Sequence, residues 1–144
     1  MKNKGFTLVE LLAVIVILST ILIIAVPRIG STIDHAQQQA FKNDVETMIE
    51  TINLQYETEE KEYVDNNIVY PSYTFSNGAF TSSKTIKVDG DLPFSGSIYM
   101  NENEEIIVDK LISNNKRWCA IKTSSENEVR VGKIDDSEFN CIVE

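Results

Sequence analysis

The sequence is poor in the residues that most often carry enzyme chemistry. Histidine occurs once among 144 residues, as His35, and cysteine twice, as Cys119 and Cys141. There is no glycine-rich phosphate loop, no cysteine–histidine arrangement and no histidine cluster, and the two cysteines lack further ligands at a metal-binding spacing. We therefore expect no catalytic activity, no cofactor and no metal site. We expect His35 to be a solvated or packed side chain on a helix.

Positive charge is also scarce. Lysine and arginine number 13 against 22 aspartate and glutamate residues, which gives a net charge of −9. A surface of this sign does not neutralise phosphates, so we predict no nucleic-acid binding. Two acidic stretches, Asp89-Gly90-Asp91 and 135–138, offer oxygen ligands of the kind that calcium accepts, but neither has the spacing of an EF-hand loop. Calcium binding there is the minority interpretation.

The most informative feature that is present is an apolar run from Phe6 to Val26. Its 21 residues match the roughly 20 that a helix needs to cross a bilayer core. One carboxylate, Glu10, interrupts the run, and a charge within such a span costs about 2.5–3.5 kcal/mol on insertion scales, less near an end. Glu10 has no basic partner within a helical turn, because Lys2, Lys4 and Arg28 lie beyond the ends of the run. An ionisable group in a membrane helix indicates a function.

A short basic leader, Met1 to Gly5, precedes the apolar run. A secretory signal peptide has an apolar core of about 7–15 residues followed by a small-x-small cleavage site, whereas here the run is longer and the small residue precedes it. Cleavage between Gly5 and Phe6 would leave the apolar helix in place and create a free amine on Phe6, one helical turn from Glu10. A plain signal anchor, in which Glu10 has no role, is the alternative.

The segment from Lys4 to Leu12, with the sequence KGFTLVELL, resembles the class III signal of type IV pilins and pseudopilins. The resemblance is specific in sequence over residues 1–30. Beyond them it concerns only the expected arrangement of helix and strands. It implies that a prepilin peptidase cuts after Gly5 and N-methylates Phe6. It also implies that Glu10 meets the Phe6 amine of a neighbouring subunit when a filament assembles.

An amphipathic pattern continues beyond the apolar run. Apolar residues recur at steps of three and four, which predicts one stripe on a helix that runs from Phe6 to about Glu62. Pro27 stands where pilins carry a helix-bending proline, and we predict a kink at Pro27 and Gly30. We expect residues 57–62 to fray, because glutamates near a helix end oppose its dipole. The stripe could instead pack in a coiled coil with a partner helix. Its spacing departs from a strict heptad repeat, however, and this favours packing against a globular head. The stripe consists of Ile29, Ile33, Ala36, Ala40, Phe41, Val45, Met48, Ile52 and Tyr56.

The remainder predicts a β-rich head around Trp118. Residues 63–83 are rich in turn-forming residues, which indicates a loop-rich connector in the position of the αβ-loop of pilins. The fold class is therefore α+β, with a long N-terminal helix, hydrophobic in its first half and amphipathic in its second, packed on a small antiparallel sheet as in type IV pilins. Alternating residues predict strands at 84–88, 96–100, 105–112, 117–122 and 128–131. The expected regions are a cleaved leader (1–5), a membrane or filament-core helix (6–26), its amphipathic continuation (27–62) and the head (63–144).

Cys119 and Cys141 are the two cysteines of a small domain that lies outside the membrane. An even number of cysteines in such a domain favours a disulfide, and two free thiols are the alternative. The bond would close a loop of 23 residues, which stabilises the fold by roughly 3–3.5 kcal/mol in the chain-entropy model. In pilins a bond of this kind holds the C-terminal segment on the sheet.

We predict a structural subunit rather than an enzyme. The resemblance implies a pilin, and the head favours the major pilin of a type IV pilus used for adhesion, twitching motility or biofilm formation. Its partners would be further copies of itself, minor pilins, the prepilin peptidase, and the assembly platform and ATPase in the membrane. Lys2 and Lys4 orient the precursor in a bacterial membrane with its N-terminus in the cytoplasm, and the filament would be extracellular. A pseudopilin of a type II secretion or DNA-uptake system is the first alternative. An anchored surface-binding protein that never polymerises is the second.

Overall fold

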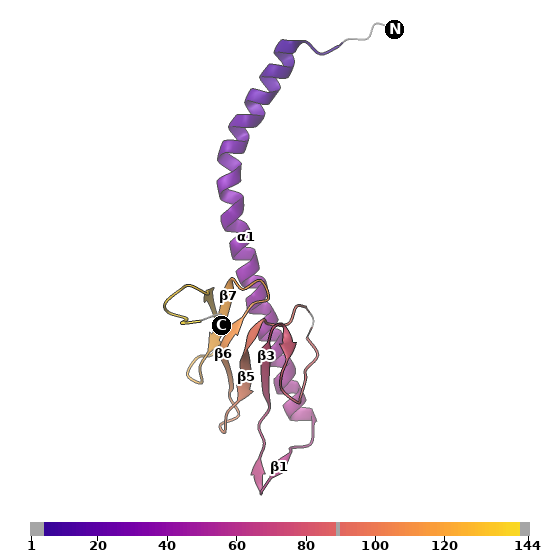
Figure 1. Cartoon of the computed structure of the whole chain (residues 1–144), viewed down its shortest axis with the longest axis vertical. Coiled ribbons are helices and arrows are strands. Elements are labelled where there is room, and N and C mark those ends of the chain that lie inside the picture. Colours follow the sequence, from indigo (N-terminus) through magenta and orange to yellow (C-terminus); the bar gives the residue numbers. More distant parts are fainter. Residues whose placement is uncertain (1–4, 89, 142–144) are drawn as a thin grey trace. The chain divides into compact units, whose positions relative to one another are not determined.

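The structure is a computed structural model that describes residues 5–88 and 90–141, apart from the side chains of residues 27 and 28. The chain divides into two compact units, residues 1–37 and 38–144. One helix, α1 (Leu8–Thr58), contributes to both units, and strands β1 to β8 all belong to the second (Figure 1). The predicted α+β class, a long N-terminal helix with an antiparallel sheet, is confirmed.

In the first unit α1 exposes its apolar side chains on every side. The large apolar residues from Leu8 to Val26 are between 49% and 80% exposed. By length and composition the helix can cross a membrane, since it contains a window of mean hydropathy 3.0 that is 0% buried. The hydroxyls of Ser19 and Thr20 donate to helix carbonyls at 2.7 and 2.8 Å. The run therefore presents apolar surface while these hydroxyls are hydrogen-bonded within the helix, as an apolar environment requires.

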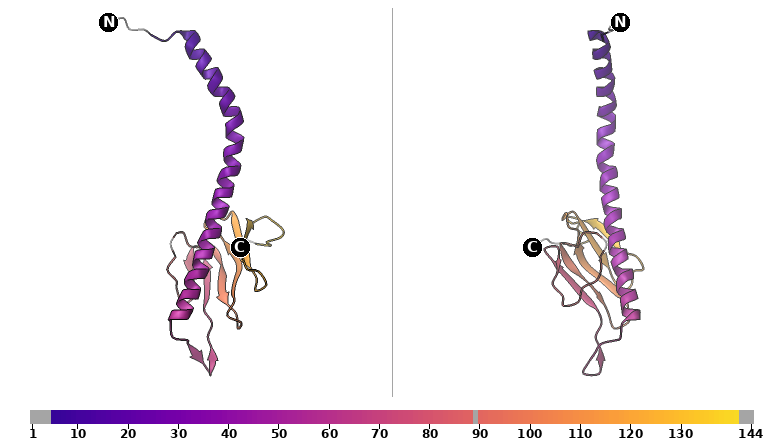
Figure 2. Two further views of the ribbon diagram at one scale, coloured as in Figure 1. Left: turned by 180° about the vertical axis from the view of Figure 1, so that it is seen from behind. Right: turned by 90° about the vertical axis from the view of Figure 1, so that its right-hand side faces the viewer.

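The second unit contains a six-stranded antiparallel sheet in the order β4-β3-β5-β6-β7-β8 and a separate two-stranded hairpin, β1-β2. The part of α1 that belongs to this unit lies along one face of the six-stranded sheet (Figure 2). The strands are β1 (Tyr63–Val64), β2 (Asn67–Ile68), β3 (Ser72–Ser76), β4 (Ala79–Phe80), β5 (Ser95–Met100), β6 (Ile106–Ile112), β7 (Trp118–Lys122) and β8 (Arg130–Lys133).

The hydrophobic core fills the space between this part of α1 and the sheet. The helix contributes Phe41, Val45, Met48 and Ile52, each at most 8% exposed. In β3 buried and exposed residues alternate strictly, as expected for a strand with one face on a core. The sheet contributes Tyr73, Phe75, Ile98, Met100, Ile106, Val108, Leu111, Trp118 and Ala120.

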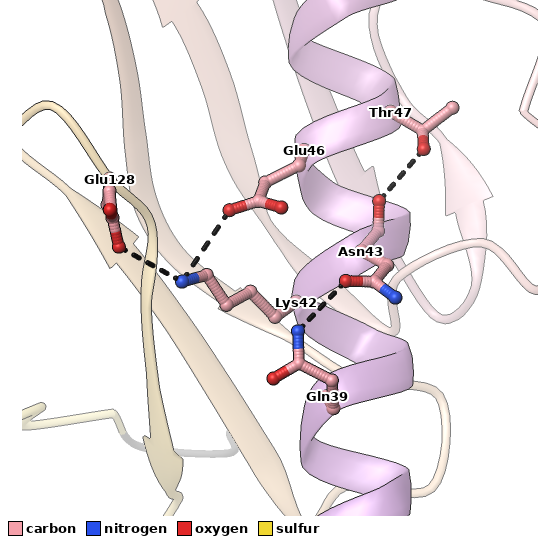
Figure 3. A network of polar contacts seen from close by, with 6 residues as sticks. All are labelled: Gln39, Lys42, Asn43, Glu46, Thr47 and Glu128. Atoms are coloured by element: carbon pink, nitrogen blue, oxygen red, sulfur yellow. Dashed lines mark hydrogen bonds and ion pairs between the residues drawn. The ribbon is translucent and has the colours of Figure 1, made fainter.

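Polar side chains connect α1 to the sheet at the rim of this core. The Lys42 ammonium lies 3.6 Å from a carboxylate oxygen of Glu46 and 3.3 Å from one of Glu128, which precedes β8 (Figure 3). Gln38 donates to the carbonyl of Val131 in β8. Because the side chains of Glu46 and Glu128 are 43% and 81% exposed, solvent screens these pairs, and they orient the helix more than they stabilise the fold.

Close contacts require glycine at two positions in the sheet. Gly96 has a φ of +113°, and a Cβ there would lie 2.5 Å from the carbonyl oxygen of Lys110. At Gly132, in β8, a Cβ would overlap the ring of Phe139. The absence of a side chain at Gly132 therefore lets the C-terminal segment lie directly on β8.

The buried stripe of α1 is shorter than the sequence predicts. Ile29 and Ile33 are 55% and 48% exposed, and Ala36 and Ala40 are exposed as well. Burial begins at Phe41, although the three- and four-residue steps begin earlier. The helix also ends at Thr58 rather than near Glu62, in agreement with the expected weakening of its glutamate-rich end.

Two predictions about the head, one of a strand and one of a loop-rich connector, are wrong. Residues 84–88 form no strand, and the six-stranded sheet pairs its strands without them. The alternation of the segment reflects core packing instead, since Ile86 is buried at 6% exposure. Conversely, residues 63–83 are not a loop-rich connector but contain β1 to β4. The sequence signal for β3 and β4 is Asn77-Gly78, whose φ values of 52° and 72° suit a two-residue hairpin turn.

Candidate functional site

The predicted cleavage and methylation residues lie just before α1. Gly5 and Phe6 are outside regular secondary structure, and the Phe6 side chain is 86% exposed. A Cβ on Gly5 would meet no atom within 4 Å, so packing does not require glycine there. Lys2 and Lys4, the basic residues of the predicted leader, lie outside the described residues. The Gly5–Phe6 bond is thus in an exposed segment next to the first helical turn.

Thr7 and Glu10 form a capping box at the start of α1. The Thr7 backbone N–H and its hydroxyl both donate to Glu10 Oε2 at 2.8 Å. In return, the Glu10 backbone N–H donates to Thr7 Oγ1 at 3.3 Å. Thr7 is the N-cap and Glu10 occupies position N3, so each side chain satisfies a backbone donor that the helix leaves unpaired. Glu10 therefore has a defined position on the end of the helix.

This partner of Glu10 is not the basic residue that a buried carboxylate suggests. The structure supplies a threonine three residues earlier instead. The signal was available, because Thr-x-x-Glu before an apolar run is the pattern of a capping box. All of the bonds that the Glu10 carboxylate accepts go to Oε2, and within residues 5–88 and 90–141 its Oε1 has no hydrogen-bond partner. One oxygen of the carboxylate remains available to a donor from another molecule.

The predicted kink residues lie inside α1, which is helical through residues 27–30. Proline has no backbone N–H, so at Pro27 the helix lacks one intrahelical hydrogen bond. A Cβ on Gly30 would meet no atom within 4 Å, so no close contact accounts for glycine there. A bend at Pro27 and Gly30 stays a prediction.

The two cysteines form a disulfide in the second unit. Cys119 in β7 and Cys141 have Cα atoms 6.4 Å apart and are 0% and 6% exposed. They pack with Phe139 in a small cluster on the face of β7 and β8 that points away from α1, since Ala120, the next residue of β7, faces the helix core. The bond attaches the C-terminal segment to the sheet, as predicted.

No group of three or more His, Cys, Asp or Glu side chains suited to a metal ion occurs in the described part of the chain. His35 lies exposed on α1. Of the two acidic stretches that suggested calcium, the first has Asp89 outside the described residues and an exposed Asp91, and the second, residues 135–138, is exposed throughout. Partial burial, and then the charge of Asp91, raise the pKa of Asp44, as expected for a carboxylate near another carboxylate.

A polar network joins the end of α1 to the turn between β5 and β6. Glu104 Oε1 accepts from the Tyr56 hydroxyl at 2.9 Å and from the Lys61 ammonium at 3.2 Å. The hydrogen bonds from Tyr56 and Lys61 hold the pKa of Glu104 below its usual value, since they favour the charged carboxylate. This network fixes the last turn of α1, where glutamates oppose the helix dipole.

Residues 1–26 match a family model described as the prokaryotic N-terminal methylation motif. The chain carries this motif. It indicates a class III signal of the type IV pilin-like kind and a substrate of prepilin peptidase. It covers the five predicted leader residues, the Thr7–Glu10 capping box and the exposed apolar half of α1, and it points to a structural protein rather than an enzyme family. Neither the comparison with curated proteins nor that with solved structures found a match.

Proposed function

We propose that this chain is a pilin, the structural subunit of a type IV pilus, and that it is the major subunit of the filament. The observation that carries this proposal is the start of α1: a methylation motif in which Glu10 is oriented by a capping box at the head of an exposed apolar helix. Such a helix needs lipid or other helices around it, and a filament core of identical helices provides them.

In the first step the prepilin peptidase hydrolyses the Gly5–Phe6 bond. It then transfers a methyl group to the new Phe6 amine from an activated methyl donor that the enzyme binds; the bond from the donor to the methyl group breaks as the N–C bond forms, and the amine loses a proton. The exposure of this segment supports access by an enzyme. Hydrolysis leaves the carboxylate on the leader and the amine on the apolar helix. The processed subunit remains in the membrane through residues 6–26 until the assembly platform and its ATPase transfer it to the growing filament.

In the second step the Phe6 amine of one subunit meets Glu10 of another. A carboxylate buried without a partner carries a large desolvation penalty, and a charge-assisted hydrogen bond offsets it. The capping box supports this role because it holds Glu10 Oε2 toward Thr7 and leaves Oε1 for the incoming amine. The pair would set the axial register of neighbouring helices, and the proposed bend at Pro27 and Gly30 would adapt each helix to the filament core.

The test compares three variants of the full chain in the native cell. Glu10→Ala should be cleaved and methylated normally but should yield few filaments. Glu10→Gln keeps a hydrogen-bond acceptor for Thr7 without the charge and should fail in the same way, whereas Thr7→Ala, which removes the capping hydroxyl and keeps the charge, should retain more assembly. Normal filaments from Glu10→Gln would refute the ion pair.

Labelling with gold-conjugated antibody tests the assignment as major subunit. Label along the whole shaft is the expected result. Unlabelled surface filaments would contradict the assignment. The pseudopilin alternative would be favoured by a different result. In that case the surface pili lack the chain, and the label is found on short periplasmic or cell-wall structures instead.

A further inference from the structure

The helical hydrogen bonds of α1 begin only after the proposed cleavage bond. Gly5, Phe6 and Thr7 lie outside regular secondary structure, and the helix starts at the next residue. The Leu11 N–H donates to the Thr7 carbonyl at 3.2 Å, whereas no backbone N–H in the described part of the chain donates to the carbonyl of Gly5 or of Phe6. The Gly5 carbonyl, which a peptidase attacks, therefore lies outside the helical hydrogen bonds.

The side chain of Thr7 holds the start of α1 at this place. If the helix continued toward the N-terminus, the Glu10 N–H would donate to the Phe6 carbonyl, four residues earlier. In the structure the Glu10 N–H donates instead to Thr7 Oγ1 at 3.3 Å. The Thr7 hydroxyl and the Phe6 carbonyl thus compete for one donor, and the hydroxyl occupies it. A capping side chain of this kind stabilises a helix that starts directly after it.

Without the capping hydroxyl, α1 could extend over the cleavage bond. The Glu10 N–H would then donate to the Phe6 carbonyl and the Val9 N–H to the Gly5 carbonyl. A Gly5 oxygen that is bonded within a helix is not free to accept hydrogen bonds from a peptidase, although such bonds stabilise the oxyanion that forms on this atom. The peptidase would first have to unwind the turn. Gly5 is a weak helix former and opposes the extension, but it offers the Glu10 N–H no competing acceptor.

We propose that Thr7 is a positioning residue for the cleavage reaction, because its hydroxyl stops α1 short of the Gly5–Phe6 bond and keeps that bond in a form that the peptidase can bind. This inference rests on the proposed function, of which cleavage at Gly5 is a part. In the reaction, water adds to the Gly5 carbonyl carbon and the C–N bond breaks. One hydrogen of the water passes to the Phe6 nitrogen, and the hydroxyl stays on Gly5. Thr7 exchanges no atom in these steps and only raises the fraction of precursor that can be attacked.

The role of Thr7 is separate from that of the Glu10 side chain. The Glu10 carboxylate accepts from the Thr7 N–H and hydroxyl at 2.8 Å, but the competition with the Phe6 carbonyl involves only the Glu10 backbone. Loss of the carboxylate leaves the Thr7 hydroxyl on the Glu10 N–H, so the cleavage bond stays outside the helix. Loss of the hydroxyl frees that N–H although the carboxylate remains. Thr7 therefore serves processing, and the Glu10 carboxylate serves assembly.

The test measures cleavage of the full-length precursor by the native prepilin peptidase in membranes, followed by mass spectrometry of the intact chain. Thr7→Val keeps the branched shape and removes the hydroxyl. It should raise KM about fivefold, the factor typical for loss of a threonine cap, and leave kcat unchanged, because only the fraction of precursor able to bind falls. Thr7→Ser and Thr7→Asn, whose side chains also cap helices, should retain the KM of the parent. Glu10→Ala is the matched control and should be cleaved with the kinetics of the parent.

The variants separate this proposal from the function on which it rests. A KM of Thr7→Val equal to that of the parent would overturn the role of Thr7 and leave the pilin assignment standing. A KM of Thr7→Asn as high as that of Thr7→Val would also overturn it, because the peptidase would then recognise the shape of threonine rather than the cap. So would an equal defect in Glu10→Ala. A parent precursor that the peptidase leaves uncleaved would overturn the proposed function and this inference with it.

Discussion

The disulfide between Cys119 and Cys141 should contribute a large part of the stability of the second unit. We consider the double variant Cys119→Ala/Cys141→Ala. The bond joins residues 22 apart in sequence, and closing a loop of this length removes unfolded-state entropy worth roughly 3.4 kcal/mol in the chain-entropy model. Because both cysteines are buried with Phe139, the variant also loosens the segment that covers β7 and β8.

The assay is urea unfolding of the full chain in a mild detergent. Trp118 is the sole tryptophan and is 3% exposed, so its fluorescence reports the opening of the core next to the disulfide. We expect the variant to unfold at lower urea than the parent, and we expect a reductant to shift the parent and leave the variant unchanged. A loss below about 1 kcal/mol, close to the error of the extrapolation to water, would refute this reasoning. So would a parent that does not respond to reductant.

Three further predictions test other parts of the account. Gly5→Leu should block processing without affecting the fold, because the site has open space for a side chain; mass spectrometry should find residues 1–5 still attached, and a mature Phe6 terminus would contradict this. Ile52→Ala should cost about 2–5 kcal/mol of unfolding free energy because Ile52 is fully buried, whereas Leu54→Ala on the same helix, at 63% exposure, should change it by at most about 0.5 kcal/mol. Hydrogen bonds from Tyr56 and Lys61 lower the pKa of Glu104 from 4.5, so the folded state binds this proton less tightly than the unfolded state, and the contribution of Glu104 should be lost as the pH falls below about 4.5. Thermal unfolding of Glu104→Gln should show a weaker loss in that range, and an unchanged pH profile would count against the network.

The start of the chain could be interpreted from sequence because its signals are local. The spacing of Gly5, Phe6 and Glu10, the length of the apolar run and the motif match all concern contiguous residues. The buried stripe from Phe41 to Ile52 was also predicted, since helical periodicity reports a face that packs. The partner of Glu10 within the chain is a threonine hydroxyl, which an argument from charge alone does not predict.

The head was harder to predict because its pairings are not local. An alternating pattern shows that one side of a segment is buried, but it does not show whether the segment pairs with a strand. Residues 84–88 bury Ile86 without belonging to the sheet. In β3, by contrast, the exposed face consists of serine and threonine, which made the segment resemble a loop. The segment is nevertheless a strand that pairs with β4 on one side and β5 on the other. The meeting of the acidic residues after α1 with the turn before β6 likewise depends on contacts more than 40 residues apart in sequence.

The most direct test of the central claim is the mass of the N-terminal peptide of the chain recovered from surface filaments. The account predicts a peptide that begins at Phe6 and carries one additional methyl group on its amine. A chain that begins at Met1, or at an unmethylated Phe6, would contradict the proposal that processing at Gly5 prepares the partner of Glu10.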